Sequence, residues 1–330
     1  MKYQNPYGTT GTNIPYINGN PATGVEGSIP PAAAIQYPMT EIVNVITNAG
    51  LTPSDSDLQQ LWEAILAMIA GYAVRKVPAT TFYVNGSTGN DTNNGLTPST
   101  AFATIAGAES YIAQFQSFVP VTINVAAGTY TIASNNAAFY IVNSLISSWN
   151  IVGAGSGTTI IDATATNSAG FQTYGDQVKV SNFTVLSNKP FSSQSGGRLI
   201  LSNIAVASMT TGDAFAASNG GLILLSGPIA LAGTAASDFS AELGGTIMIG
   251  WADRSTPAAV DITFASHTVT QTAFAGMSGT ILLYPSVVTW HGTPTGHAYN
   301  CQTAGGIQAN GNTIPGSLSG NVTSPGWYAA

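Results

Sequence analysis

The stretches "GGRLILSNIAVAS" (residues 196–208) and "GGLILLSGPIALAG" (residues 220–233) contain the repeated pattern from which we infer the fold. Each begins with a glycine pair, continues as an apolar run, takes a polar step and ends in a second apolar run. Three related stretches, "GGTIMIGWADRS", "SGTILLYPSVVTW" and "GGIQANGNTIPGS", begin at residues 244, 278 and 305. A repeat of this kind is typical of a β-solenoid, in which every repeat turns the same corner above the last one.

The intervals between the five stretches are 24, 24, 34 and 27 residues. The longer third interval predicts an extra loop or bulge near residues 252–273. Shorter β-prone runs such as "VTINVAAG" and "WNIVGAG" precede the repeats, and little helix is expected after about residue 116. A β-sandwich also has short strands and is the alternative fold, but it has no need of glycine pairs at a regular interval.

The composition limits the possible partners. Only 6% of the 330 residues are charged, and the net charge is −7. The seven Lys and Arg residues form no patch larger than Arg75-Lys76, which argues against nucleic-acid binding. Cys301 is the single cysteine, so we expect no intrachain disulfide and a small core side chain at this position.

The chain shows no membrane or export signal that we can recognise. Its first residues, "MKYQNPYGTT", lack the apolar core of a signal peptide. Its longest apolar run, residues 64–74, is too short to span a bilayer. We therefore expect synthesis in the cytoplasm and no membrane insertion.

Residues 1–37 contain many Tyr, Asn, Pro and Gly residues without a period. A disordered tail is one interpretation. Apolar and aromatic residues nevertheless recur every few positions, which favours an extended arm that becomes ordered on a partner. The residues predicted to contact this partner, or to stiffen the exit from the arm, are Tyr7, Ile14, Tyr16, Ile29, Pro30 and Pro31.

Residues 38–77 change to a helical period and predict a helical hairpin. The first helix is expected to end at Asn48-Ala49-Gly50, and the second to begin with Thr52 as N-cap and Pro53 at its first position. One hairpin of this length has little core, so its apolar stripes are expected to pack against copies of themselves in a bundle. The stripe of the second helix contains Leu58, Leu61, Trp62, Ile65 and Ile69.

Residues 78–116 read as a strand, a loop "NGSTGNDTNNGLTPS" and a helix capped by Thr97. The loop lacks the lysine and the glycine spacing of phosphate-binding motifs, and it lacks most carboxylates of a calcium loop. We interpret it as turns formed by Asn and Gly. The amphipathic helix that follows is expected to cover the open end of the solenoid.

Acidic residues are the candidates for catalysis, because glycan-cleaving β-solenoids use Asp and Glu side chains. Asp238 and Glu242, with Arg254 further on, come nearest to a cluster. No acidic pair recurs at the repeat interval, and the three histidines are scattered. We expect no catalytic, cofactor-binding or metal-binding residues. The acids beyond residue 150 are Asp162, Asp176, Asp213, Asp238, Glu242, Asp253 and Asp261, and the histidines are His267, His291 and His297.

Three stretches carry a resemblance to a known family. "EGSIPPAAAIQYPMTEIVNVITNAGLTPSDSDLQQLWEAI" (residues 26–65) resembles the N-terminal region of tail fibre or tailspike proteins of tailed bacteriophages and prophages. "YVNGSTGNDTNNGLTPSTAFATIAGA" (residues 83–108) is similar to the opening of the right-handed parallel β-helix in tailspikes and pectate-lyase-like proteins. "GNTIPGSLSGNVTSPGWY" (residues 311–328) resembles the closing stretch of some of these chains.

The resemblance implies a mainly β homotrimer in the virion tail or baseplate. Its parts would be an attachment arm (1–37), a helical oligomerisation segment (38–77), the first strand, loop and capping helix (78–116) and a right-handed parallel β-helix with a closing segment (117–330). The expected function is a structural or adhesive fibre or spike. It would bind tail or baseplate proteins and project toward a host surface glycan or another fibre. The alternative is a tailspike enzyme that degrades host polysaccharide, and a bacterial surface adhesin is a third interpretation.

Overall fold

The computed structural model describes residues 3–72, 76–132, 137–142, 144–164 and 169–330. The chain divides into two compact units, Met1–Val74 and Arg75–Ala330. We call them the helical unit and the β unit and describe each by itself. None of the described helices combines the length and the hydropathy that a membrane crossing needs.

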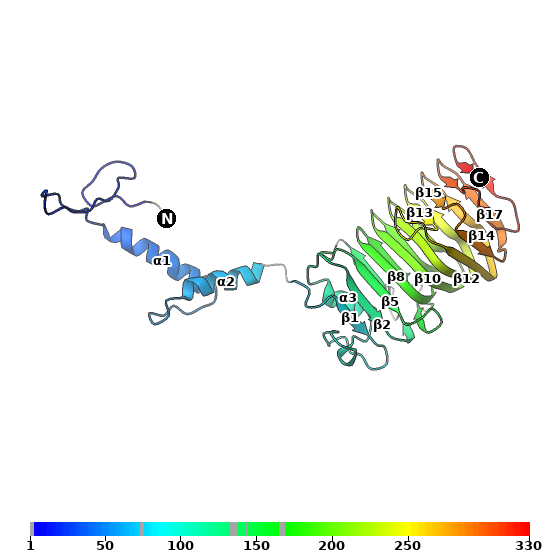
Figure 1. Ribbon diagram of the computed structural model, residues 1–330, viewed down its shortest axis with the longest axis horizontal. Helices are drawn as coiled ribbons and strands as arrows, with labels where there is room; N and C mark the ends of the chain where they lie inside the picture. The colour runs from blue at the N-terminus through cyan, green and yellow to red at the C-terminus, as the bar shows by residue number, and fades with distance from the viewer. Residues whose placement is uncertain (1–2, 73–75, 133–136, 143, 165–168) are drawn as a thin grey trace. The chain divides into compact units, whose positions relative to one another are not determined.

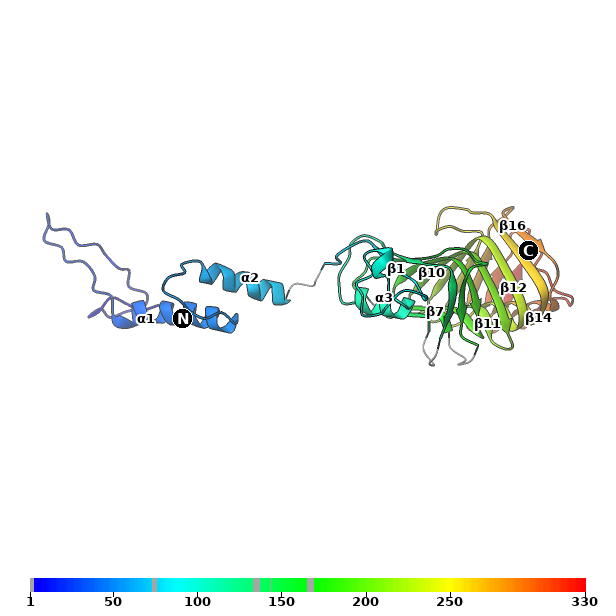
Figure 2. The ribbon, with the colours of Figure 1, turned by 90° about the horizontal axis from the view of Figure 1, so that it is seen from below.

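The strands of the β unit pair in parallel and form three ladders, which we call A, B and C (Figures 1 and 2). Figure 1 shows ladder A with its strands side by side in chain order. Neighbouring rungs belong to successive repeats: Leu199, for example, pairs with Ile223, which pairs with Ile247. The strands of ladder A are β1 (Thr81–Val84), β2 (Val121–Val125), β5 (Trp149–Gly153), β13 (Thr246–Ile249), β15 (Thr280–Leu283), β18 (Gly306–Gln308), β20 (Trp327–Ala329) and the first parts of β8 (Gln177–Leu186), β10 (Arg198–Met209) and β12 (Leu222–Ala241).

Ladders B and C continue the same repeats, because several long strands bend from one ladder into the next. Ladder B contains β3 (Gly128–Thr131), β6 (Thr159–Asp162), later parts of β8, β10 and β12, the first part of β14 (Val260–Ala275) and β16 (Val288–His291). Ladder C contains β4 (Phe139–Val142), β7 (Ala169–Tyr174), β9 (Lys189–Gln194), β11 (Asp213–Ala217), the ends of β12 and β14, β17 (Thr295–Cys301) and β19 (Asn321–Val322).

The fold is therefore mainly β, with one large system of parallel strands, and it is consistent with a β-helix-like solenoid. A β-sandwich is built from antiparallel sheets, so the parallel ladders contradict that alternative. The ladders continue to β20, so the residues predicted as a closing segment pair like the rest.

From β10 to β18, each repeat enters ladder A through one kind of turn, and this turn explains the glycine pairs. In the turn that precedes Leu222, φ is +50° at Asn219 and +75° at Gly220, and Gly221 N donates to Ser218 O at 2.9 Å. Two successive positive φ values are the signature of a type I′ turn. A Cβ on Gly221 would lie 2.0 Å from the carbonyl oxygen of Ser193 in the preceding repeat. The first glycine thus supplies the left-handed backbone, and the second allows two repeats to approach closely.

We call the edge formed by these turns the C–A corner, because it joins ladder C to ladder A. The equivalent hydrogen bond closes the turn at Gly197, Gly245, Gly279, Gly305 and Gly326. Gly305 therefore takes the place of Gly279 one repeat later, although the sequence pattern aligned Gly306 with it. The last interval predicted from the sequence, 27 residues, is wrong by one because Ala304 (φ +63°) supplies the left-handed position there.

The longer third interval contains both a loop and a bulge. Leu225 pairs with Ile249, whereas Gly227 pairs with Val260, so nine additional residues lie between β13 and β14. One more residue is accommodated at Ser266, where the register shifts and φ is +47°. The prediction of an extra loop or bulge in this region is confirmed.

A column of aromatic rings fills the interior beside ladder C. Successive rings of Phe171, Phe191, Phe215 and Phe239 stack with centroid distances of 5.7, 5.5 and 5.5 Å. Each of these rings is fully buried, and each belongs to a residue that pairs with its counterpart in the next repeat. The column ends where Ala273 pairs with Phe239. Burial of these rings selects the register, because a slip of one residue would turn every ring outward.

The helix α3 (Ile105–Ile112) covers the first strand of ladder A, as expected for a cap at this end (Figure 1). The Tyr111 ring lies 6.2 Å from Phe82 of β1 and 5.4 Å from Phe102. The predicted start of the helix at Thr97 is wrong. Thr97 caps only a short 3₁₀ turn, η1 (Pro98–Thr100), because Phe102 pairs with Val84 and interrupts the helix.

The loop before α3 is occupied by its own side chains. Asp91 Oδ1 accepts from the backbone N–H of Ala103 and of Thr104, each at 2.9 Å, and Asp91 Oδ2 accepts from Thr104 Oγ1 at 2.8 Å. Thr104 in turn caps α3 by accepting from Gly107 N at 2.9 Å. The helix start is thus satisfied by a protein carboxylate, which agrees with turns rather than a phosphate-binding loop.

The helical unit contains α1 (Ala32–Asn48) and α2 (Gln60–Tyr72). α1 ends where the sequence predicts, but it begins at Ala32 rather than Pro38, because three alanines extend the helix and Pro38 removes only one backbone hydrogen bond. The predicted N-cap Thr52 is wrong: residues 52–59 form a loop. The Gln60 side chain holds this loop by donating to Thr52 O and accepting from Ser54 N, both at 2.7 Å.

The arm folds back on itself and is not a single extended run. Tyr3 Oη donates to Ile14 O at 2.8 Å, and Tyr16 Oη donates to Gln4 O at 2.9 Å. A tight turn follows, in which the backbones of Asn20 and Val25 exchange two hydrogen bonds. The tyrosine hydroxyls give this segment local order, which the expectation of an extended chain did not include.

The glycine pair provides a direct test of the turn geometry. We expect Gly221→Ala to reduce the free energy of unfolding by about 2–3 kcal/mol, because its Cβ would collide with the backbone of the preceding repeat. Gly220→Asn should cost about 1 kcal/mol or less, because Asn tolerates the left-handed region. Urea unfolding followed by circular dichroism compares the two variants. Equal losses would contradict the proposed difference between the two glycines.

Candidate functional site

The apolar stripe of α2 is exposed in the single chain. Ala64 is fully buried on the side where α2 contacts α1, and Ile46 is the buried residue of α1. The residues predicted for self-association lie elsewhere on the helix or just before it. Their exposed fractions are 94% for Leu58, 38% for Leu61, 61% for Trp62, 38% for Ile65 and 57% for Ile69.

α1 presents a second apolar surface. A shallow groove on this helix is lined by Ile35, Met39 and Val43 together with Ala32, Gln36 and Thr40. Ile35, Met39 and Val43 are all exposed. Each helix therefore buries one face against the other and leaves a further apolar face for a partner.

The arm residues predicted to bind a partner are also accessible, although they come from a folded-back segment. Tyr7 is 75% exposed, and Ile29, which accepts a hydrogen bond from Tyr7 N through its carbonyl, is exposed as well. Tyr16 is exposed and contacts Tyr3, whereas Ile14 is half-buried. Pro30 is exposed, and Pro31 is the residue immediately before α1, where its side chain makes no capping hydrogen bond.

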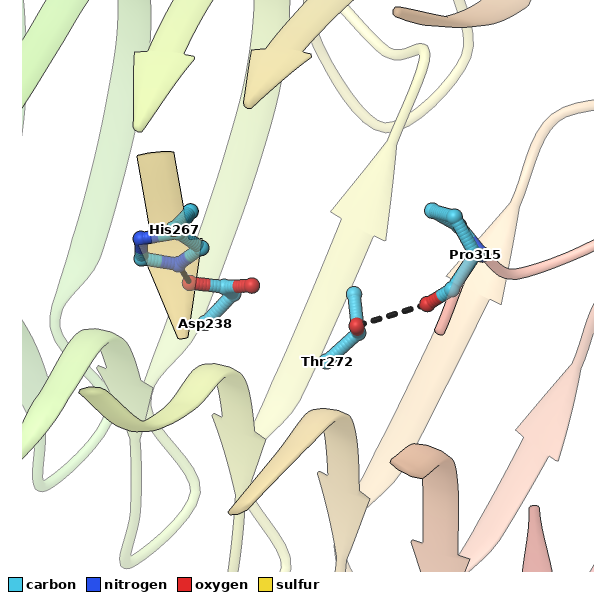
Figure 3. A network of polar contacts seen from close by, with 4 residues as sticks. All are labelled: Asp238, His267, Thr272 and Pro315. Carbon is cyan, nitrogen blue, oxygen red and sulfur yellow. Dashed lines mark hydrogen bonds and ion pairs between the residues drawn. The ribbon is translucent and has the colours of Figure 1, made fainter. Parts of the chain in front are cut away.

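Asp238, one of the two acids singled out for catalysis, lies inside the β unit. Its Oδ1 is 2.5 Å from Nε2 of His267, and both side chains are completely buried (Figure 3). Burial raises the pKa of the Asp238 carboxyl, and the contact with His267 opposes that rise. The bulge at Ser266 brings His267 into the interior, where its ring stacks on Phe264. A glycan cannot reach this pair, so Asp238 is a structural residue.

Asp213 and Glu242 are the more accessible acids of this region. Asp213 accepts hydrogen bonds from Ser237 and Ser240, and burial raises its pKa despite these bonds. Burial also raises the pKa of Glu242, with a smaller contribution from the charge of Asp213. Arg254 lies exposed in the loop between β13 and β14. Of the predicted group of Asp238, Glu242 and Arg254, Glu242 instead lies near Asp213, which the sequence analysis did not single out.

The remaining candidates lie in turns, at the surface or buried in the β unit. Thr164 lowers the pKa of Asp162 by hydrogen bonding, and bonds from Ser255 and Thr256 lower the pKa of Asp253 to about 2. Asp176 is buried and accepts from Ser144. The others are Asp261, 3.8 Å from His291, His297, 2.7 Å from Ser319 O, and Cys301, a buried side chain whose pKa burial raises to about 11.

One further polar contact of the β unit involves the C-terminal segment. Thr272 Oγ1 donates to Pro315 O at 2.7 Å and attaches the C-terminal segment to β14 (Figure 3). Within the described ranges, no group of three or more His, Cys, Asp or Glu side chains could hold a metal ion.

Glu109 of α3 was not among the sequence candidates. Its Oε2 accepts from Tyr140 N at 3.0 Å and so fastens the capping helix to β4. Burial raises the pKa of this carboxyl to about 7. In the sequence, this residue could have been noticed as the single charged residue of the helix 105–112. Its position facing the sheet is decided by the packing of Ile105, Ala108 and Ile112.

Comparisons with models of protein families, with curated proteins and with solved structures gave no match. We therefore infer function from the residues of the chain.

The raised pKa of Glu109 predicts a pH-dependent stability. The stabilising contribution of Glu109 to the free energy of unfolding is fully present below about pH 4.5 and is lost as the pH rises through about 7. Glu109→Gln keeps an acceptor for Tyr140 N without the charge. It should raise the free energy of unfolding at about pH 8 by up to about 3 kcal/mol and have little effect at about pH 4. Thermal unfolding at both pH values measures this, with Glu26→Gln on the exposed arm as the control. An equal gain at both pH values would exclude titration of Glu109 as the cause.

Proposed function

We propose that this chain is a non-enzymatic structural or adhesive component of a bacteriophage tail, a short homotrimeric fibre or spike. The observation that carries the proposal is the pair of apolar helix faces on α1 and α2 that the single chain leaves exposed. Association of three copies through these faces would bury them. The sequence resemblance to tail fibre and tailspike proteins supports the same assembly, and it supports a location in the virion tail or baseplate after synthesis in the host cytoplasm.

The finer fold that we propose for the β unit is a right-handed parallel β-helix. Its support is the succession of parallel ladders joined by short turns, since parallel crossovers are right-handed in nearly all proteins. A rod of this kind with only 6% charged residues in the chain suits a projecting element. Its partner at the far end would be a host surface glycan or another fibre.

The arm is the proposed attachment to a tail or baseplate protein. Its exposed Tyr7, Tyr16 and Ile29 give it apolar contacts for such a partner. Three arms on one trimer would bind together at high effective concentration, so a modest affinity for each arm is sufficient.

Trimer formation through α2 is tested by Leu61→Asp combined with Ile65→Asp. Both side chains would be buried in the trimer, and an unpaired buried charge costs several kcal/mol. We expect light scattering to find a trimer for the unmodified protein and smaller species for the variant. Glu63→Asp, a change on the same helix that keeps the charge, is the control. A stable monomer for the unmodified protein would refute the proposal.

The alternative function is a tailspike enzyme that cleaves host polysaccharide. Asp213 and Glu242 favour it, because two partly buried carboxyls with raised pKa values are a common feature of acid–base sites. No acidic pair recurs along the ladders, however, and Asp238 is sealed in the interior.

Incubation with a panel of capsular and O-antigen polysaccharides separates the two functions. We expect no release of oligosaccharide, measured as new reducing or unsaturated ends. Release that persists in Asp261→Asn but disappears in Asp213→Asn or Glu242→Gln would instead establish the enzyme. Asp238→Ala is unsuitable for this purpose, because it would leave His267 without its partner in the interior.

A further inference from the structure

Two turns of the C–A corner carry large apolar residues at a position where the fold does not need them. Leu243 and Met277 occupy the second position of the turn with φ of +50° and +46°, and each is 49% exposed. In other repeats the same position holds Ser195, Asn219 and Thr303. A left-handed backbone is unfavourable for Leu and Met, and a half-exposed side chain gains little from burial in the single chain. The two residues are adjacent, since Gly244 N donates to Met277 O at 3.2 Å.

The edge from which the chain enters ladder A carries a second apolar patch nearer the start of the β unit. Phe118 is 83% exposed, Val119 50% and Leu145 55%. Ser117 N donates to Leu145 O at 3.0 Å, and Ser117 pairs with Ile146. These residues precede β2 and β5 as Leu243 precedes β13, so both patches lie on one edge. From the β5 rung to the β13 rung there are four steps, roughly 19 Å along the stack.

Little charge opposes contact between copies along this edge. Asp176, at the equivalent corner before β8, is buried and bound to Ser144. Arg198 follows the turn at Gly197 and donates to Gln177. Glu242 is half-buried and has a raised pKa, and the intervening turns carry Ser195 and Asn219. Small polar residues therefore separate the two apolar patches.

Chain connectivity relates this edge to the helical unit, whatever the arrangement of the two units. Lys76 pairs with Gln116, and Val77 N donates to Gln116 O at 3.0 Å, two residues before Phe118. Tyr72, the last residue of α2, is only four residues before Lys76, a distance of at most about 14 Å. If three copies associate through α2, this short connection limits how far the Phe118 patch of each copy can lie from its associated helices.

We propose that the β units of three copies pack against one another along the C–A corner. The patch of Phe118, Val119 and Leu145 and the patch of Leu243 and Met277 contact the same residues of the neighbouring copies. A second copy fits better than an unrelated partner. When two copies lie parallel, each repeat of one is level with the same repeat of the other, so both apolar patches meet their counterparts. This inference rests on the trimer of the proposed function and adds its contact line.

Cysteine cross-linking tests the contact line. Met277→Cys places a thiol at the corner, while the native Cys301 is buried. Ser208→Cys is the matched control, because Ser208 is exposed and left-handed (φ +59°) but lies on the corner between ladders B and C. Oxidation followed by a non-reducing gel should give about tenfold more disulfide-linked dimer for Met277→Cys, since a disulfide requires Cα atoms within about 7 Å. Equal cross-linking of both variants would overturn the inference.

A second variant pair measures the contribution of the corner to assembly. Leu243→Asn with Met277→Asn installs the residue found at position 219, so the fold should be retained. We expect this variant to dissociate at a trimer concentration about tenfold higher than the unmodified protein. The control variant, Ser195→Asn with Thr303→Asn, should dissociate at the same concentration as the unmodified protein. Dissociation of both variants at the same concentration would place the contact elsewhere.

The outcomes separate this inference from the proposed function. A trimer in light scattering with no preferential cross-link at Met277→Cys leaves the trimer standing and refutes the corner contact. A monomeric unmodified protein refutes both.

Discussion

The close approach of successive repeats at the C–A corner is the constraint on which the β unit depends. The backbone of Gly221 lies against the carbonyl of Ser193, at a distance that leaves no room for a Cβ. A polar backbone in this position has its hydrogen bonds satisfied by the turn and by the next rung of ladder A. Because the repeats from β10 to β18 turn at the same place, their strands stack in parallel, and the side chains between them line up in columns. In this part of the β unit the repeated glycines are a requirement of the architecture rather than a mark of loose structure.

The interior columns then fix the register. The stacked rings of Phe171, Phe191, Phe215 and Phe239 lie on consecutive rungs, and each ring is buried by the ones above and below. Where the column stops at Ala273, the bulge at Ser266 and the loop after β13 change the course of the chain. The buried pair of Asp238 and His267 occupies this irregular region. Buried ionisable groups of this kind commonly mark catalytic sites, but here the pair is closed to solvent, and the His267 ring stacks on Phe264.

The candidate functional surfaces all lie outside these columns. α1 and α2 bury one face against each other and leave apolar residues at spacings of three and four for further contacts. The arm is held by tyrosine hydroxyls and a tight turn, with Tyr7 and Ile29 directed to solvent. At the C–A corner, Leu243 and Met277 depart from the polar residues of the equivalent turns. Uncovered apolar side chains on a chain with so few charges are more readily explained by self-association than by catalysis.

The parallel repeat, three of its four intervals, the extra loop in the third interval and the end of α1 follow from the amino-acid sequence alone, because glycine turns and hydrophobic periods are local properties. The apolar stripe of α2 was also predicted from the sequence, from residues spaced three and four apart. Contacts between repeats set three further features: Asp238 is buried beside His267, Asp213 and Glu242 lie close together and partly buried, and Glu109 fastens the capping helix. The starts of α2 and α3 were misplaced for the same reason: Gln60 and Phe102 make contacts with segments that the local pattern does not include. Whether a side chain is buried, and which side chains it contacts, depends on residues from different repeats. These residues come together only when the folded strands pair in register.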